Sequence, residues 1–125
     1  PEYAPEYFNR LAARDEFARV VNNLMSTNDL DAMIYPNVQV VPPTKQECDD
    51  GVWPTMAFPT NTLIASQTWL PAISVPAGFT NEGLPVGLEI MARRYDEPTL
   101  FRLAFGFEQT TRYRRAPSNT PELIE

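Results

Sequence analysis

Residues 69–92 place two short apolar segments around a polar turn, in the sequence WLPAISVPAGFTNEGLPVGLEIMA. The first segment, Ala72–Val75, is too short for a helix and too apolar for an exposed loop. The second, Val86–Ala92, carries Val, Leu, Ile and Met around a single charge, Glu89. Between them Thr80–Gly83 supplies turn residues, and its glycine suits the left-handed conformation that closes a three-residue hairpin. The stretch therefore predicts a β-hairpin whose strands are buried on most of their surface.

Two amphipathic helices are predicted, one before the hairpin and one after it. The first runs from about Asn9, its candidate cap, to Met25 and has an apolar face that consists of Ala13, Phe17, Val20, Val21 and Leu24. The second begins at Asp96-Glu97-Pro98, where an acidic cap and a proline in the first turn are typical of a helix start. Its apolar stripe runs to about Thr111 and consists of Leu100, Leu103, Ala104 and Phe107.

Shorter elements and irregular segments fill the rest of the chain. Asp31–Pro36 is a short apolar run stopped by a proline, which predicts a buried strand of about four residues. Residues 59–68 predict a short helix, with Thr60 or Asn61 as its cap and residues 63–65 as its buried part. The long loop at 37–58 has no clear periodicity, and we expect it to lie near a binding cleft. The tail at 112–125 is expected to lie on the surface.

These elements predict an α/β fold with too few strands to be self-sufficient. A sheet of three strands that is covered on both faces needs further strands beside it. The sheet is therefore expected to be incomplete in this chain. The abrupt start at Pro1 agrees with that expectation, because it suggests a fragment or a processed subunit.

The composition limits the partners and the compartment. The net charge is −6 and the nine arginines are scattered among sixteen acidic residues, so nucleic acid is not an expected partner. The single cysteine, Cys48, cannot form an internal disulfide and fits a reducing cytoplasm. No apolar run approaches the ~20 residues that span a bilayer, and no basic and apolar leader opens the sequence. We expect a soluble, cytoplasmic protein without a membrane partner.

The chain lacks the residues of the common hydrolytic sites. It has no histidine, which excludes Ser–His–Asp and Cys–His nucleophiles and histidine metal sites within it. Its only lysine, Lys45, lies among acidic residues that favour the charged amine, so it does not suit the role of a base. Ser66 and Ser74 are expected to be packed hydroxyls bonded to backbone. Asp49 and Asp50 have no third ligand near them, so no catalytic residue, metal site or cofactor is assigned here.

The hairpin also carries a family resemblance. Ser74–Gly78, a short polar turn and then Gly83–Glu89 resemble the late hairpin of the amidase signature family, whose members are hydrolases that cleave amide C–N bonds. The resemblance extends from about Asp31 to the tail, with Asp96-Glu97 opening a helix in the same place. It implies that residues 1–125 are the C-terminal portion of an amidase domain, with part of a mixed β-sheet flanked by helices. The family's earlier segment, which supplies a serine nucleophile, a second serine and a lysine base, is absent.

The resemblance implies that this portion forms one wall of a substrate pocket. By position in the sequence, the candidate wall residues are Trp53, Phe58, Asn61, Thr62 and Trp69. Such an aromatic wall suits an apolar or aromatic acyl group. Trp69 replaces a glycine that is usual in the family, so either the backbone there avoids positive φ or the indole fills a cavity. Phe58-Pro59-Thr60 stands where relatives that hydrolyse glutamine for transamidation tend to have an acid, which favours a simpler amidase.

Two functional interpretations remain open. In the first, the chain completes an amidase together with an N-terminal portion, on the same or another polypeptide, and acts on a small-molecule amide. In the second, it is a non-catalytic partner subunit or binding module of the same shape. A fragment without an independent role is a third possibility.

Overall fold

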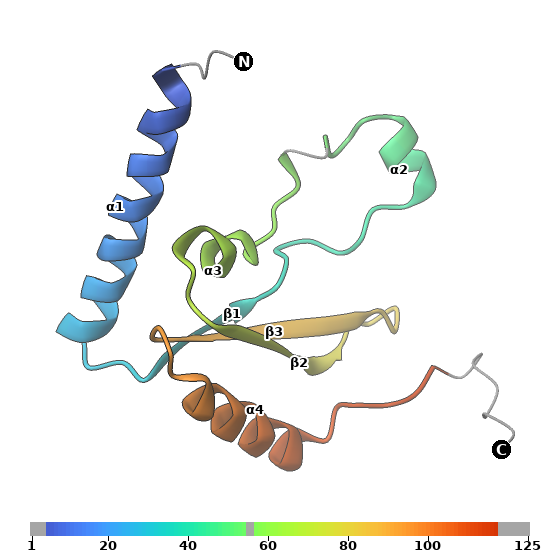
Figure 1. The fold of residues 1–125 in the computed structure, drawn as a ribbon. Helices are drawn as coiled ribbons and strands as arrows, with labels where there is room; N and C mark the ends of the chain where they lie inside the picture. Colours follow the sequence, from blue (N-terminus) through green and yellow to red (C-terminus); the bar gives the residue numbers. More distant parts are fainter. Residues whose placement is uncertain (1–4, 55–56, 118–125) are drawn as a thin grey trace, which may run out of the picture.

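The computed structural model describes residues 5–54 and 57–117. It is an α/β arrangement, as predicted, in which helices cover both faces of a β-sheet (Figure 1). In chain order the elements are α1 (Pro5–Thr27), β1 (Ala32–Pro36), α2 (Lys45–Asp49), α3 (Leu63–Thr68), β2 (Ala72–Phe79), β3 (Pro85–Ala92) and α4 (Glu97–Thr111). Within the two described ranges, no helix is both long enough and apolar enough to cross a membrane.

The sheet has the strand order β1-β3-β2 with antiparallel pairing throughout, so β3 is the central strand. Ile90 of β3 lies between Ile34 of β1 and Ile73 of β2. The predicted hairpin is therefore confirmed, but the burial expected for its first strand is wrong: only Val75 of β2 is buried, and Ala72 and Ser74 are exposed. β2 is longer than predicted, because it continues through a β-bulge between Pro76 and Gly78.

The hairpin turn has the predicted geometry. The backbone N–H of Thr80 donates to the carbonyl of Leu84 at 2.8 Å, which leaves three residues between them. The N–H of Gly83 donates to the carbonyl of Thr80 at 3.0 Å, and Gly83 has a φ of 83°. This left-handed conformation favours glycine, which has no Cβ to clash.

Two hydrophobic clusters lie on opposite faces of the sheet, because alternate side chains of β3 point to opposite sides. On the face under α3 and the C-terminal end of α1, the buried side chains are Val21, Met25, Ala65, Leu70 and Met91. On the face covered by α4 they are Val75, Ile90, Ala92, Leu100 and Ala104. Full burial of one large apolar side chain contributes about 1.5–3 kcal/mol, so these clusters hold the helices against the sheet.

The first helix differs from its prediction in its start and in its buried face. α1 begins at Pro5, and Asn9, the predicted cap, lies inside the helix. The buried side chains are Ala18, Val21 and Met25, whereas Phe17, Val20 and Leu24 of the predicted face are exposed. Apolar residues lie all round this helix, and only one stripe contacts α3 and the sheet. The other stripe has no cover among the described residues.

The strand predicted at Asp31–Pro36 and the short helix predicted at 59–68 are both present, as β1 and α3, but their burial differs from the prediction. β1 is an edge strand, and Ile34 is 65% exposed because the apolar cluster over α4 does not reach it. α3 begins at Leu63 with Thr62 at the N-cap, rather than Thr60 or Asn61. A helix of six residues presents little surface to a core, and only Ala65 and Thr68 of α3 are buried.

The loop at 37–58 contains a helix that was not predicted. α2 is closed by a capping box in which Thr44 and Glu47 bond to each other's backbone. The hydrogen bonds from Thr44 lower the pKa of the Glu47 carboxyl. The sequence signal was the T-x-x-E pattern at 44–47, which is a helix start. The loop that carries α2 extends away from the sheet (Figure 1).

The last helix begins where predicted. Asp96 occupies the N-cap position of α4 and Pro98 lies in its first turn, although the Asp96 side chain makes no capping hydrogen bond. Leu100 and Ala104 are buried, whereas Leu103 of the predicted stripe is exposed. The tail is exposed from residue 112 to residue 117, as predicted. The part of the predicted tail at 118–125 lies outside the described residues.

Candidate functional site

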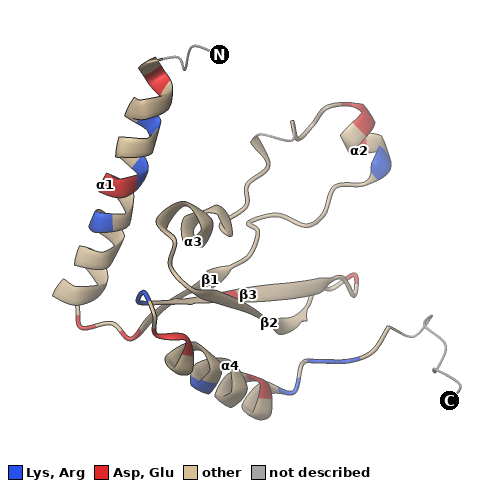
Figure 2. Cartoon of the chain, viewed as in Figure 1, with Lys and Arg blue, Asp and Glu red and all other residues tan. Residues whose placement is uncertain are grey.

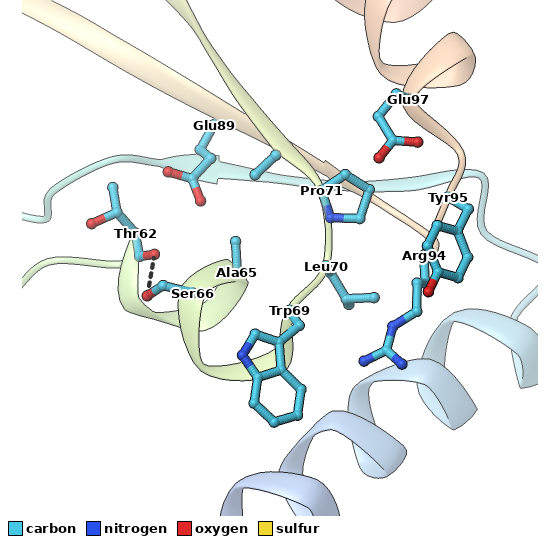
Figure 3. Close-up of a pocket in the computed structure, with 11 residues that line it drawn as sticks. Thr62, Ala65, Ser66, Trp69, Leu70, Pro71, Glu89, Arg94, Tyr95 and Glu97 are labelled. Carbon is cyan, nitrogen blue, oxygen red and sulfur yellow. Dashed lines mark hydrogen bonds between the residues drawn. The ribbon is translucent and has the colours of Figure 1, made fainter.

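A shallow cavity of about 530 Å³, largely open to solvent, lies between α3, the start of β2 and the segment that leads into α4 (Figure 3). Its lining combines apolar side chains with a few polar ones. The lining residues are Thr62, Ala65, Ser66, Trp69, Leu70, Pro71, Ala72, Glu89, Arg94, Tyr95 and Glu97. The volume lies within the range of about 300–1,000 Å³ that is usual for small-molecule sites.

Trp69, a predicted wall residue, forms part of this lining. It ends α3 in the left-handed conformation, with φ 54° and ψ 30°, so the expectation that the backbone avoids positive φ is wrong. Trp69 is 54% exposed and lines a second cavity as well, so its indole lies at the surface. The guanidinium of Arg14 lies 4.8 Å from the ring centroid and also donates to the carbonyl of Ser66 at 3.3 Å. These contacts fix α1 to the end of α3.

Glu89 is a buried charged residue in the lining of the cavity. It lies at the middle of β3, is 5% exposed and accepts a hydrogen bond of 2.9 Å from the hydroxyl of Tyr35. Burial, that hydrogen bond and the charge of Glu89 raise the pKa of Tyr35 far above its ordinary value. In Figure 3 the Glu89 carboxylate projects toward α3, on the side of Thr62 and Ser66. Sequence reasoning missed this residue as a site candidate, although it was the only charge in a buried strand.

Asn61, another predicted wall residue, holds the backbone together at the end of β1. Its Nδ2 donates to the carbonyl of Pro36 at 2.8 Å, and its Oδ1 accepts from Gln39 at 2.9 Å. Nearby, Nδ2 of Asn37 donates to the hydroxyl of Ser74 at 2.8 Å. The amide of Asn61 thus has partners at both ends and does not line the cavity.

Trp53 and Phe58 form a pair of their own. Their rings meet edge to face, with centroids 6.3 Å apart and an interplanar angle of 81°. Of the five predicted wall residues, the structure therefore brings Thr62 and Trp69 together in one cavity and pairs Trp53 with Phe58 outside its lining. Their role as a substrate wall stays a prediction.

The residues considered for catalysis lie on different elements, with Lys45, Cys48 and Asp49 on α2, Ser66 on α3 and Ser74 on β2. Lys45 and Cys48 are exposed on α2. The hydroxyl of Ser66 donates within its own helix, to the carbonyl of Leu63 at 3.2 Å. Within the described part of the chain, no group of three or more His, Cys, Asp or Glu side chains is placed to hold a metal ion. Acidic and basic residues are spread over α1, α2, α4 and the hairpin turn (Figure 2).

Comparison with known proteins identifies the family. Residues 2–101 match the Amidase family. The chain is 30% identical to a glutamyl-tRNA(Gln) amidotransferase subunit of Limosilactobacillus fermentum, in an alignment that covers 94% of this chain and 23% of the relative. It is 51% identical over 53 residues to the subunit of the same name from Methanosarcina acetivorans, which covers 42% of this chain and 11% of the relative.

Solved structures give the same result. The corresponding subunit of the Thermotoga maritima glutamyl-tRNA(Gln) amidotransferase superimposes with a TM-score of 0.73 and 31% identity, over 88% of this chain and 24% of that one. The peptide amidase from Stenotrophomonas maltophilia superimposes with a TM-score of 0.66 and 30% identity, over 94% of this chain and 23% of that one. This chain therefore spans about a quarter or less of the length of these relatives.

Proposed function

The chain belongs to the amidase family, and from this premise we propose that it is the C-terminal portion of an amidase signature hydrolase. One observation carries the proposal. The family match covers residues 2–101, and 94% of this chain aligns with a relative of which the chain covers only 23%. The missing partner in this proposal is the N-terminal portion of the same domain, on one polypeptide or on two.

In the complete enzyme, a serine outside residues 1–125 attacks the carbonyl carbon of a small-molecule amide. A lysine, also outside this chain, accepts the serine proton and passes it to the leaving amine as the C–N bond breaks, and water then hydrolyses the acyl-enzyme to release the acid and the free serine. This chain contributes strands, covering helices and one wall of the substrate pocket. The proposal agrees with the local contacts, because Ser66 bonds to its own helix and Ser74 bonds to Asn37.

The first experiment locates the nucleophile in the complete natural protein that contains this chain. We would label the protein with a fluorophosphonate, which reacts with activated serines, and map the labelled peptide by mass spectrometry. The expected label lies outside residues 1–125. A label on Ser66 or Ser74 would contradict the proposal.

The second experiment measures turnover of a linear amide by the same complete protein. Lys45→Ala is expected to change kcat/KM by less than twofold, because Lys45 lies exposed on α2. A loss of several orders of magnitude would assign the base to this chain and refute the proposal. A complete protein with neither label nor turnover would support the non-catalytic binding module instead.

A further inference from the structure

Glu89 is a buried carboxylate without a counter-ion among the residues that the structure describes. The ion pairs in that part of the molecule join Arg19 to Glu16 and Arg114 to Glu108, and neither includes Glu89. Its one hydrogen bond there comes from Tyr35, at 2.9 Å. A carboxylate has about four acceptor positions, and burial of a charge is costly unless the charge is paired and hydrogen-bonded. Glu89 therefore retains unused capacity to accept hydrogen bonds.

Glu89 lines the cavity of about 530 Å³, so a ligand in that cavity could donate further hydrogen bonds to its carboxylate. The Tyr35 hydroxyl donates to one oxygen of Glu89, so the carboxylate is the acceptor in this pair. Arg94 also lines the cavity, but its guanidinium points toward α1 and away from Glu89 (Figure 3). No ion pair with Glu89 is formed among the described residues, so the carboxylate remains open to a cation from outside them.

The remaining walls of the cavity are suited to an organic body beside that cation. Ala65, Leu70 and Pro71 supply apolar surface, and the exposed indole of Trp69 forms part of the rim. Small-molecule sites typically combine such apolar walls with a few placed polar groups. A salt bridge to a buried carboxylate gives direction, while the apolar surface gives most of the buried area.

We propose that this cavity binds a small organic cation, in which a primary ammonium or guanidinium group pairs with Glu89 and an apolar or aromatic body lies along Ala65, Leu70 and Trp69. The site is a binding site and includes no covalent step. It goes beyond the amide hydrolysis proposed above, and it stands whether or not the complete protein is an active hydrolase.

The test compares two matched probes on the complete natural protein, benzylamine and benzyl alcohol, by isothermal titration calorimetry. They share the ring and differ in the charged group. We expect benzylamine to bind at least tenfold more tightly. Glu89→Gln keeps the shape of the side chain and removes its charge. It should lower the affinity for benzylamine at least tenfold and change the affinity for benzyl alcohol by less than twofold. Glu82→Gln, an exposed carboxylate on the hairpin turn, is the control and should change neither.

A second variant keeps the proposal testable if Glu89→Gln does not fold. Ser66→Phe places a ring at the exposed rim of the cavity, away from the buried clusters, and should abolish benzylamine binding. Three results would overturn the proposal: equal affinity for the two probes, unchanged binding in both variants, or no binding of benzylamine to the unmodified protein. The last result would mean that a basic side chain from the rest of the protein occupies the site.

Discussion

Trp69 holds a conformation that is costly for a residue with a side chain. The left-handed region brings Cβ close to the following carbonyl oxygen, which costs roughly 1–2 kcal/mol for residues other than glycine. Here the φ of 54° lets the chain leave α3 and enter β2 within a few residues. The contact of the indole with Arg14 offsets part of that cost.

Two substitutions at Trp69 separate the backbone from the side chain. Trp69→Gly and Trp69→Ala both remove the indole, but only glycine relieves the positive φ. We therefore expect the glycine variant to be more stable than the alanine variant by about 1 kcal/mol, measured as the difference in free energy of unfolding in urea. Equal stabilities would show that the φ at this position carries no strain.

The hydroxyl of Tyr35 contributes to stability because it donates a hydrogen bond to a buried carboxylate. Tyr35→Phe is expected to destabilise the protein by about 1–3 kcal/mol at neutral pH, since Glu89 loses its hydrogen-bond donor. Tyr95→Phe, at a side chain that is 85% exposed, is the control and should change the free energy of unfolding by less than about 0.5 kcal/mol. A loss of the same size in both variants would contradict the assignment.

Tyr35 also predicts a pH dependence. Its pKa is raised in the folded protein, so above the ordinary tyrosine pKa of about 10 the unfolded chain loses this proton while the folded chain keeps it. The contribution to stability is therefore complete below pH 10 and is lost as the pH rises from there toward the folded-state pKa. Urea midpoints measured from pH 8 to pH 11 should fall more steeply in the unmodified protein than in Tyr35→Phe. Parallel curves would refute this linkage.

The candidate site was only partly predictable from the sequence. Trp69 attracted notice because it departs from the family pattern, and Thr62 because of its position. Glu89 was visible as a lone charge, but its partner Tyr35 lies 54 residues away and nothing local connects them. A site made by cross-strand contacts becomes visible only when the strand order is known.

At the scale of elements, the hairpin shows the best agreement between sequence and structure. Its signals are local, since the turn residues and the flanking apolar segments lie within about twenty residues of each other. The buried face of α1, in contrast, could not be predicted from the local sequence. Apolar residues surround that helix, and the choice between its stripes depends on where α3 and β3 lie. No pattern within the helix itself encodes that choice.

Substitution of two glycines in different elements by alanine should change the stability of the protein in opposite directions. Gly83 has a φ of 83° in the turn, and Gly83→Ala should cost about 1 kcal/mol, although a new Cβ would meet no atom within 4 Å. Gly106 lies inside α4, also without neighbours, and Gly106→Ala should stabilise by about 0.5–1 kcal/mol. Thermal unfolding of the two variants checks both signs. Stabilisation by Gly83→Ala would show that the turn adopts another conformation in solution.

At the scale of the whole molecule, apolar side chains remain uncovered on several elements. They include Phe17, Val20 and Leu24 on α1, Ile34 on β1, and Phe101 and Phe105 on α4. Both β1 and β2 also present an unpaired strand edge within the described sheet. Surfaces of this kind are typical of interfaces, which agrees with a portion that packs against the rest of a larger domain.

The 125-residue chain alone should therefore self-associate and bind hydrophobic dyes. We expect it to bind anilinonaphthalene sulfonate and to associate as its concentration rises, since exposed apolar faces and free strand edges both favour self-contact. Dye fluorescence and sedimentation velocity over a hundredfold range of concentration would measure the two effects. A monomer at every concentration that binds no dye would contradict the expectation.

The strand order also predicts an order of events in folding. β2 and β3 are joined by a tight turn, whereas Tyr35 of β1 must find Glu89 of β3 across 54 residues. Non-local strand pairing is slower than local pairing because the entropy of loop closure must be overcome first, so we expect β1 to dock onto a hairpin that has already formed. Loop-closure entropy rises only by about 0.6 kcal/mol for each doubling of length. Insertions in the segment that carries α2 should consequently slow this docking step and lower the stability of the folded state by the same small amount.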